Sequence, residues 1–311
     1  MKTVGIDRDR VRRAFSGPVA GVHPPFHRDG SLDMDGLRRE IDHNIAAGSG
    51  VLLMTYWDGL HSVLTDGEIA EVLTVVVDQV AGRAVVVAAD RQWATPKEVE
   101  FADFARDAGA DVLMVLPPNW AGSVTHDSLI AHYRTVSEHI PVMLVTGAYN
   151  AQRPLGLQVV GTAVDTIPNI VAMKEDVGGE FGRRVTLLTH ERWTVVSGGL
   201  KQDVLNLRPY GLDGFMSWFL HFIPDIAHAF WRTIEAGDVA ASARFIRDYD
   251  WFDFSETLGG GYDAMYHGAQ EIFGIAERWR RGPYVSLTDA DMDRLRGFFA
   301  GLPPLSAPAR V

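Results

Sequence analysis

The sequence predicts an α/β fold: a (β/α)8 TIM barrel with a C-terminal extension of three helices. Eight short apolar runs recur along the first three quarters of the chain. They are continuous rather than alternating, which is typical of parallel strands covered on both faces. Helix start signals lie between the runs. After about residue 238 the apolar runs stop, and only helical patterns follow.

The apolar runs are separated by about 20–35 residues, the interval that a strand followed by a helix requires. They are Pro18–Val22, Gly50–Met54, Ala84–Ala89, Asp111–Leu116, Pro141–Val145, Ile170–Met173, Thr194–Ser197 and Gly214–Ser217. Eight strands that are each followed by a helix favour a closed barrel, with an open sheet of eight parallel strands as the alternative.

Several of the intervening helices carry recognisable N-terminal signals. Thr65 and Glu68 stand three residues apart, as in a capping box. Thr95-Pro96-Lys97-Glu98 repeats this spacing, with proline at the first helical position. Further helices are expected after Ser31-Leu32-Asp33, from Thr125 and from Pro224-Asp225.

We assign residues 1–237 to the barrel and residues 238–311 to a helical extension packed on it. The three expected helices of the extension are Asp238–Leu258, Tyr262–Arg281 and Thr288–Phe299. Three consecutive glycines separate the first from the second. We expect no chemistry from the extension itself.

Composition limits the classes of function. With 311 residues, 47% of them hydrophobic, the chain can bury one large core, and its net charge of −11 argues against a nucleic-acid partner. The absence of cysteine excludes disulfides, thiolate nucleophiles and cysteine-ligated metals. No apolar run reaches transmembrane length and the start lacks a signal-peptide pattern, so we expect a cytoplasmic protein without membrane contact.

Lys174 ends the apolar run Asn169–Met173. Burying an ammonium group is expensive, so a lysine at the carboxyl end of a barrel strand indicates chemistry. A desolvated lysine loses its proton more easily, and the neutral amine can attack a carbonyl to form a Schiff base. The alternative is a side chain that reaches solvent and pairs with Glu175 or Asp176. Strand alternation turns Glu175 to the opposite side, which favours a structural role for it.

Six stretches in the expected order carry a family resemblance. They are Pro25-Phe26 with Asp29–Asp33, Leu64–Glu68, Ala108–Asp111, Asn169–Glu175, Ser197-Gly198 and Gly211–Ser217. From about Phe15 to Leu302 the chain resembles the dihydrodipicolinate synthase/N-acetylneuraminate lyase family. This resemblance implies a (β/α)8 barrel with C-terminal helices, class I aldolase or lyase chemistry, and Lys174 as the imine-forming residue.

The chain departs from the family pattern after the second strand. Family members carry Gly-Thr-Thr-Gly-Glu there, whose hydroxyls and backbone N–H groups hold the carboxylate of a pyruvoyl unit. Here the stretch is Tyr56-Trp57-Asp58-Gly59-Leu60. Asp58 is thus an anion at a site that should receive one, so it must point away, be protonated or serve a different substrate.

The family's proton-relay tyrosines are also replaced. Val145 stands where the fifth strand normally ends in tyrosine, although Tyr149 could return a hydroxyl from the following loop. Trp120 aligns with a tyrosine that reaches a neighbouring subunit's site, and an indole cannot relay a proton as a phenol does. Dihydrodipicolinate synthesis itself is therefore not expected.

The residues just after each strand should form the site. They are rich in indole and imidazole, which suits a substrate with an aromatic or extended apolar part, unless the tryptophans only close the barrel end. The expected catalytic residues are Lys174, Asp58, Tyr149 and His221. The expected substrate-binding residues are Trp57, Gly59, His61, Trp120, Arg91, Gly198 and Trp218, with surface pairing as the alternative for Arg91.

The leading hypothesis is a class I aldolase or lyase that acts on a 2-oxo acid or related carbonyl compound, including a 2-keto-3-deoxy sugar acid aldolase or dehydratase. No cofactor is expected, and the resemblance implies a homodimer or homotetramer. One alternative is a metal-dependent lyase that uses His23, Asp58, His61 and His221. Another is a non-catalytic binding protein on the same barrel.

Overall fold

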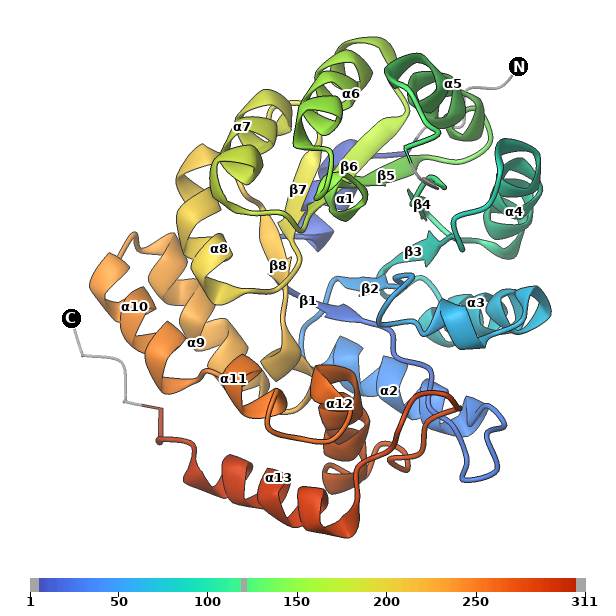
Figure 1. Ribbon diagram of the computed structural model, residues 1–311. Coiled ribbons are helices and arrows are strands. Elements are labelled where there is room, and N and C mark those ends of the chain that lie inside the picture. The colour runs from blue at the N-terminus through green and yellow to red at the C-terminus, as the bar shows by residue number, and fades with distance from the viewer. Residues whose placement is uncertain (1–5, 119–121, 306–311) are drawn as a thin grey trace.

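The computed structural model describes residues 6–118 and 122–305, and its centre is a closed parallel barrel of eight strands (Figure 1). The strands are β1 (Gly17–Gly21), β2 (Val51–Leu53), β3 (Val85–Ala89), β4 (Val112–Val115), β5 (Val142–Val145), β6 (Ile170–Glu175), β7 (Thr194–Ser197) and β8 (Gly214–Met216). β1 pairs with both β2 and β8, which closes the ring. The predicted (β/α)8 barrel is confirmed, and the open sheet is excluded.

A helix follows each strand and covers the outside of the barrel (Figure 1). These helices are α2 (Met34–Ala46), α3 (Asp66–Val80), α4 (Thr95–Ala108), α5 (His126–Ser137), α6 (Arg153–Thr166), α7 (Gly179–Thr189), α8 (Lys201–Leu207) and α9 (Pro224–Glu235). The capping box of Thr65 and Glu68 is confirmed. The predicted cap at Thr95 is wrong, because Thr95 is already helical and its hydroxyl bonds His132 on α5.

A helix that the sequence analysis missed, α1 (Arg8–Ala14), lies at the amino end of the barrel. Arg12 donates to the carbonyl oxygens of His190 and Trp193, which precede β7, at 2.5 and 2.7 Å. These bonds hold α1 against the segment that leads into β7.

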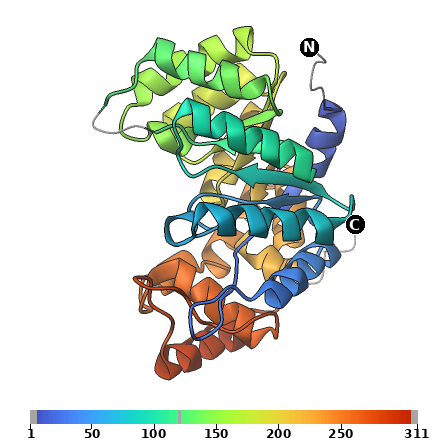
Figure 2. The same cartoon turned by 90° about the vertical axis from the view of Figure 1, so that its right-hand side faces the viewer.

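Up to residue 305, where the described part of the chain ends, the extension contains four helices instead of three. They are α10 (Val239–Asp248), α11 (Phe252–Ser255), α12 (Gly261–Ile272) and α13 (Asp289–Gly301). The predicted helix 238–258 is interrupted where Tyr249 leaves helical geometry, and the predicted helix 262–281 ends early before Gly274, whose φ is +70°. Figures 1 and 2 show the extension (orange to red) gathered along one side of the barrel. No helix in the described ranges is long and apolar enough to cross a membrane.

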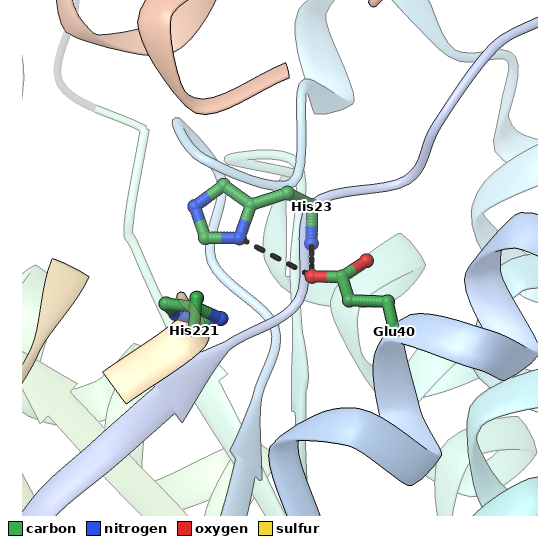
Figure 3. Close-up of side chains that lie close together, drawn as sticks. All are labelled: His23, Glu40 and His221. Carbon is green, nitrogen blue, oxygen red and sulfur yellow. Dashed lines mark hydrogen bonds and ion pairs between the residues drawn. The ribbon is translucent and has the colours of Figure 1, made fainter. Parts of the chain in front are cut away.

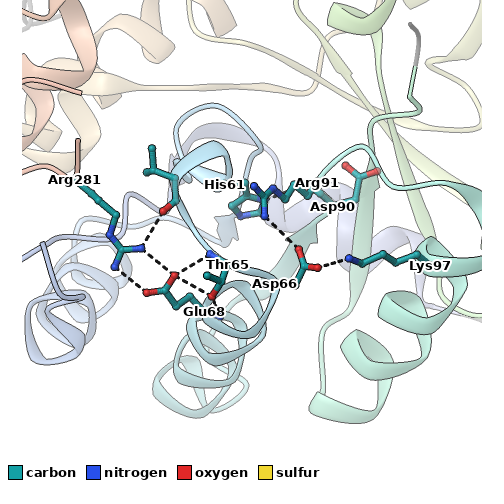
Figure 4. A network of polar contacts seen from close by, with 9 residues as sticks. His61, Thr65, Asp66, Glu68, Asp90, Arg91, Lys97 and Arg281 are labelled. Atoms are coloured by element: carbon teal, nitrogen blue, oxygen red, sulfur yellow. Dashed lines mark hydrogen bonds and ion pairs between the residues drawn. The ribbon is translucent and has the colours of Figure 1, made fainter. Parts of the chain in front are cut away.

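Arg281 fastens the segment between α12 and α13 to the barrel (Figure 4). Its guanidinium forms two hydrogen bonds to the carboxylate of Glu68 on α3, at 2.8 and 2.9 Å. It also donates to the carbonyl oxygens of Gly30 and Val63, both at 2.9 Å. The guanidinium lowers the pKa of Glu68 to about 2. A bidentate pair of this kind holds the extension in one position on the barrel.

Glu68→Gln should lower the free energy of unfolding at neutral pH by about 1–2 kcal/mol, because a charge-assisted pair is lost. The pKa of Glu68 is lowered from 4.5, so the pair stabilises the fold above pH 4.5 and loses this contribution as the pH falls toward 2. Denaturant titrations at neutral and acid pH measure the difference. Glu71, an exposed glutamate on the same helix, provides the control. An equal loss of stability in Glu71→Gln would contradict a stabilising role for the pair of Glu68 and Arg281. So would a difference between Glu68→Gln and the natural protein that does not change with pH.

Candidate active site

A cavity of about 390 Å³ opens at the carboxyl end of the barrel. It is lined by His23, Asp58, Asp176, Gly198, Gly199, Leu200, Met216, Ser217, Trp218, His221, Trp251, Phe252, Tyr262 and Tyr266. These residues come from the ends of β1, β2, β6, β7 and β8 and from the extension. In barrels of this type, this end carries the chemistry.

Lys174 lies beside this cavity, on β6, and its side chain is only 6% exposed. Its Nζ donates to Asp176 Oδ1 at 2.5 Å and stands 5.9 Å from the centre of a Trp57 ring. The pairing with Asp176 is the one considered as an alternative, but the amine is buried instead of reaching solvent. Val145, in place of the family tyrosine, is opposite Lys174 in the register of β5 with β6.

Asp176 is a site residue that the sequence analysis did not select. Its backbone N–H donates to the Thr146 hydroxyl at 2.9 Å, and its Oδ2 is buried without a hydrogen-bond partner among the described residues. A Cβ on Gly198 would lie 2.0 Å from Asp176 Oδ1 and 3.5 Å from Lys174 Nζ. Only glycine therefore leaves room for the pair. The available signal was strand alternation, which returns the second residue after a lysine to the same side.

Glu175 lies on the other side of the strand, as alternation predicts. It is 1% exposed and accepts hydrogen bonds from the backbone N–H groups of Val177 and Gly178 and from the Thr146 hydroxyl. Burial raises its pKa to about 6. The carboxylate thus shapes the turn that carries Asp176 into the site.

Asp58 faces the cavity. Its Oδ1 accepts a hydrogen bond of 2.7 Å from the hydroxyl of Tyr262 on α12, and burial together with this carboxylate raises the pKa of Tyr262. The backbone N–H groups of Asp58 and Gly59 donate to the side chain and carbonyl of Thr55, each at 3.0 Å. Gly59 is needed in this turn, because a Cβ there would lie 2.3 Å from the Thr55 carbonyl oxygen.

His221 belongs to a buried network in the cavity wall. The Tyr266 hydroxyl donates to Glu40 Oε1 at 2.9 Å and lies 2.8 Å from His221 Nδ1, which is 2.9 Å from Asn44 Oδ1. Because Tyr266 uses its hydrogen on Glu40 and an amide oxygen only accepts, Nδ1 of His221 carries the proton. Burial lowers the pKa of His221 well below its usual value, so the ring is neutral and its Nε2 is a base.

His23 joins the same network (Figure 3). Its backbone N–H donates to Glu40 at 3.0 Å, and its ring stacks on Tyr266 with centroids 3.5 Å apart. One ligand atom each from His23, Glu40 and His221 lie within 4.8 Å of one another, a grouping that could hold a metal ion. The Tyr266 hydroxyl already bridges Glu40 and His221, however, so the geometry favours a hydrogen-bonded network.

Three of the predicted residues lie elsewhere. His61 is fully buried with its Nδ1 2.9 Å from the Asp90 carbonyl oxygen, and burial lowers its pKa to about 4. Arg91 pairs with Asp66 at 3.3 Å on the surface, as its alternative interpretation had it (Figure 4). The Tyr149 hydroxyl is buried, 3.0 Å from that of Tyr133 on α5. None of the three is among the residues that line the cavity.

The tryptophans differ in their exposure. Trp57 is 43% exposed and lies near the amine of Lys174, at the edge of the site. Trp218 lines the cavity but is mostly buried, since it stacks on Trp251 and Phe299 of the extension at 5.6 and 5.7 Å. Trp120 lies outside the described residues.

Comparison with known proteins now decides the family. Residues 14–249 match the Dihydrodipicolinate synthetase family. The chain belongs to this family. The resemblance inferred from the sequence is thereby confirmed.

Individual relatives of this family are distant. A probable 5-dehydro-4-deoxyglucarate dehydratase 2 from Streptomyces avermitilis is 30% identical over 91% of this chain and 87% of its own. A 4-hydroxy-tetrahydrodipicolinate synthase 1 from Streptomyces coelicolor is 30% identical over 74% of each chain.

Solved structures of the family share the fold. A putative dihydrodipicolinate synthetase from Pseudomonas aeruginosa has a TM-score of 0.79 at 25% identity, covering 93% of this chain and 99% of its own. N-acetylneuraminate lyase from Fusobacterium nucleatum has a TM-score of 0.82 at 14% identity, covering 94% and 98%, a likeness of fold alone.

A buried carboxyl pair lies beside this family site, at the end of β3. Asp90 and Glu98 are 1% and 0% exposed, and each interacts with the other. Burial raises the pKa of Asp90 to about 7, and burial with the neighbouring Asp90 raises that of Glu98 well above its usual value. Burial of two neighbouring carboxyl groups favours their protonated, uncharged forms.

Glu98→Gln should reduce the loss of stability at alkaline pH. The pKa of Asp90 is raised from 3.8 to about 7, so the pair stabilises fully below pH 3.8 and loses this contribution as the pH rises through 7. Between about pH 5 and 9 the free energy of unfolding should fall in both proteins, and the fall should be about 1–3 kcal/mol smaller in Glu98→Gln than in the natural protein. The exposed Glu100→Gln on the same helix is the control. If the free energy of unfolding depended on pH in the same way in Glu98→Gln and in the natural protein, Asp90 and Glu98 would not be protonated as a buried pair.

Proposed function

We propose that this protein is an imine-forming, class I aldolase or lyase that acts on a 2-oxo acid or related carbonyl compound, with Lys174 as the nucleophile. The buried contact of Lys174 Nζ with Asp176 Oδ1, 2.5 Å long and at the wall of the cavity, carries this proposal. Membership of the Dihydrodipicolinate synthetase family supports it.

Asp176 has the geometry to begin the reaction. Its carboxylate accepts a proton from the ammonium group of Lys174, which leaves Nζ with a free electron pair. The neutral amine attacks the carbonyl carbon of the substrate. The carbonyl oxygen takes one proton from the nitrogen and one from the Asp176 carboxyl group, which becomes a carboxylate again, and it leaves as water. The product is an iminium ion, whose positive charge the Asp176 carboxylate stabilises.

The iminium ion then acts as an electron sink. A base removes the proton of a hydroxyl group on the carbon beta to the imine carbon, the adjacent C–C bond breaks toward the imine, and an aldehyde leaves. In an elimination, a base instead removes a proton from the carbon next to the imine carbon, and the beta hydroxyl departs as water. His221 Nε2 and the Asp58 carboxylate are the cavity groups suited to accept these protons. After C–C cleavage, the enamine takes a proton at the carbon next to the imine carbon and becomes an imine again. Hydrolysis of the imine then releases the product and regenerates Lys174.

A second candidate is a dehydratase of a 2-keto-3-deoxy sugar acid. The similarity to the Streptomyces avermitilis dehydratase over 91% of the chain favours it. The elimination would use the same imine on Lys174. An oligomer, a homodimer or homotetramer, remains the expectation from the family resemblance.

Borohydride treatment in the presence of carbonyl compounds should attach a reduced adduct to Lys174, which peptide mass spectrometry locates. Lys174→Met should abolish the adduct and turnover. Lys201 supplies a matched control, since it is also buried, its pKa is lowered to about 8 by burial, and its Nζ donates to the Tyr249 carbonyl at 2.6 Å. Lys201→Met should keep the adduct. Labelling of Lys201 instead, or of no lysine, would contradict the proposal.

Asp176→Asn should slow adduct formation by about 100-fold near neutral pH, because the ammonium group loses its proton acceptor. The rate should recover as the pH is raised, since hydroxide then removes the proton. Single-turnover trapping across a pH series measures this. A pH-independent loss would mean that Asp176 only maintains the shape of the site.

A further inference from the structure

We infer that the substrate is an uncharged carbonyl compound with an aromatic or apolar substituent, and that it carries no carboxylate next to its carbonyl. The inference rests on the proposed imine chemistry. Among the substrates proposed for that chemistry, it selects a related carbonyl compound instead of a 2-oxo acid or a 2-keto-3-deoxy sugar acid. Three observations carry it: the charges of the cavity wall, the backbone groups at the end of β2, and the apolar side chains at the opening.

The wall of the cavity is anionic. Asp58 and Asp176 both line it, and among the described residues that do so, none is an arginine or lysine. The neighbouring cations Lys174 and Arg280 are already paired, with Asp176 and Asp263 respectively. A substrate carboxylate would therefore meet like charges in a partly enclosed space, without a cation to bind it.

The backbone groups that would hold such a carboxylate are occupied. The resemblance assigns this role to hydroxyl and N–H groups after the second strand. Here Trp57 and Asp58 replace the hydroxyl residues. The N–H of Asp58 donates to the Thr55 hydroxyl, and the N–H of Gly59 donates to the Thr55 carbonyl, both at 3.0 Å. Breaking these bonds would be needed before an anion could bind.

Apart from the polar side chains of His23, Ser217 and His221, the remaining surface of the cavity is largely apolar. Trp218 and Trp251 stack on each other in its wall, and Leu200 and Phe252 are 39% and 40% exposed at its edge. The Tyr262 and Tyr266 hydroxyls donate to Asp58 and Glu40, so they are not available as donors to a polyhydroxylated chain. An aromatic substituent would cover the exposed apolar faces and require no new hydrogen bonds.

Two ketones of matched size isolate the carboxylate. Phenylpyruvate and phenylacetone share a benzyl group and differ in a carboxylate or methyl group beside the carbonyl. Trapping by cyanoborohydride at Lys174 is measured against ketone concentration, and each rate is normalised to that of N-α-acetyllysine to remove intrinsic reactivity. We expect phenylacetone to half-saturate the protein at a concentration about 10-fold lower or more. Butanone lacks the aromatic ring, so its half-saturating concentration should be higher than that of phenylacetone.

Asp58→Asn removes one negative charge from the cavity wall. It should lower the concentration of phenylpyruvate that half-saturates the protein and so bring it closer to that of phenylacetone. Half-saturation by phenylpyruvate at an equal or lower concentration than phenylacetone would overturn this inference while leaving the imine chemistry intact. An unchanged ratio in Asp58→Asn would overturn the electrostatic argument and the inference with it. If no ketone is trapped at Lys174, both the inference and the proposed function fail.

Discussion

The contact between Lys174 and Asp176 is the interaction on which the site depends. An ammonium group inside a protein is costly unless an opposite charge lies beside it, and Asp176 supplies that charge at 2.5 Å. The surrounding strand ends are arranged around this pair. Thr146, after β5, fixes the Asp176 backbone, and Gly198, after β7, leaves space for its carboxylate. Three neighbouring strands therefore hold one nitrogen where a carbonyl carbon can reach it.

The barrel and its lysine could be predicted because both leave a local signature. Each strand is an unbroken apolar run, and Lys174 interrupts this pattern at a strand end. Alternation along β6 was enough to separate Glu175, which shapes the backbone, from the residues that face the site. The same rule applied to Asp176 would have identified the partner of the lysine.

The rest of the site could not be predicted from local patterns, because it is made by contacts between distant parts of the chain. Glu40 on α2 meets Tyr266 on α12, and Asp58 meets Tyr262. Tyr149 illustrates the converse. Its place in the sequence suggested a return to the site, but the structure pairs its hydroxyl with Tyr133 on α5. Which helix face a loop residue meets is set by tertiary packing rather than by spacing along the sequence.

The extension has a consequence for how this protein acquires its site. Trp251, Tyr262 and Tyr266 belong to the last quarter of the chain, yet they line the cavity beside the lysine side of the barrel. On the ribosome, Lys174 is made long before the residues that enclose it. A barrel that has folded without its final helices would present Lys174 at an open groove. The shaped chamber exists only once the helices that carry Trp251, Tyr262 and Tyr266 have docked on the barrel.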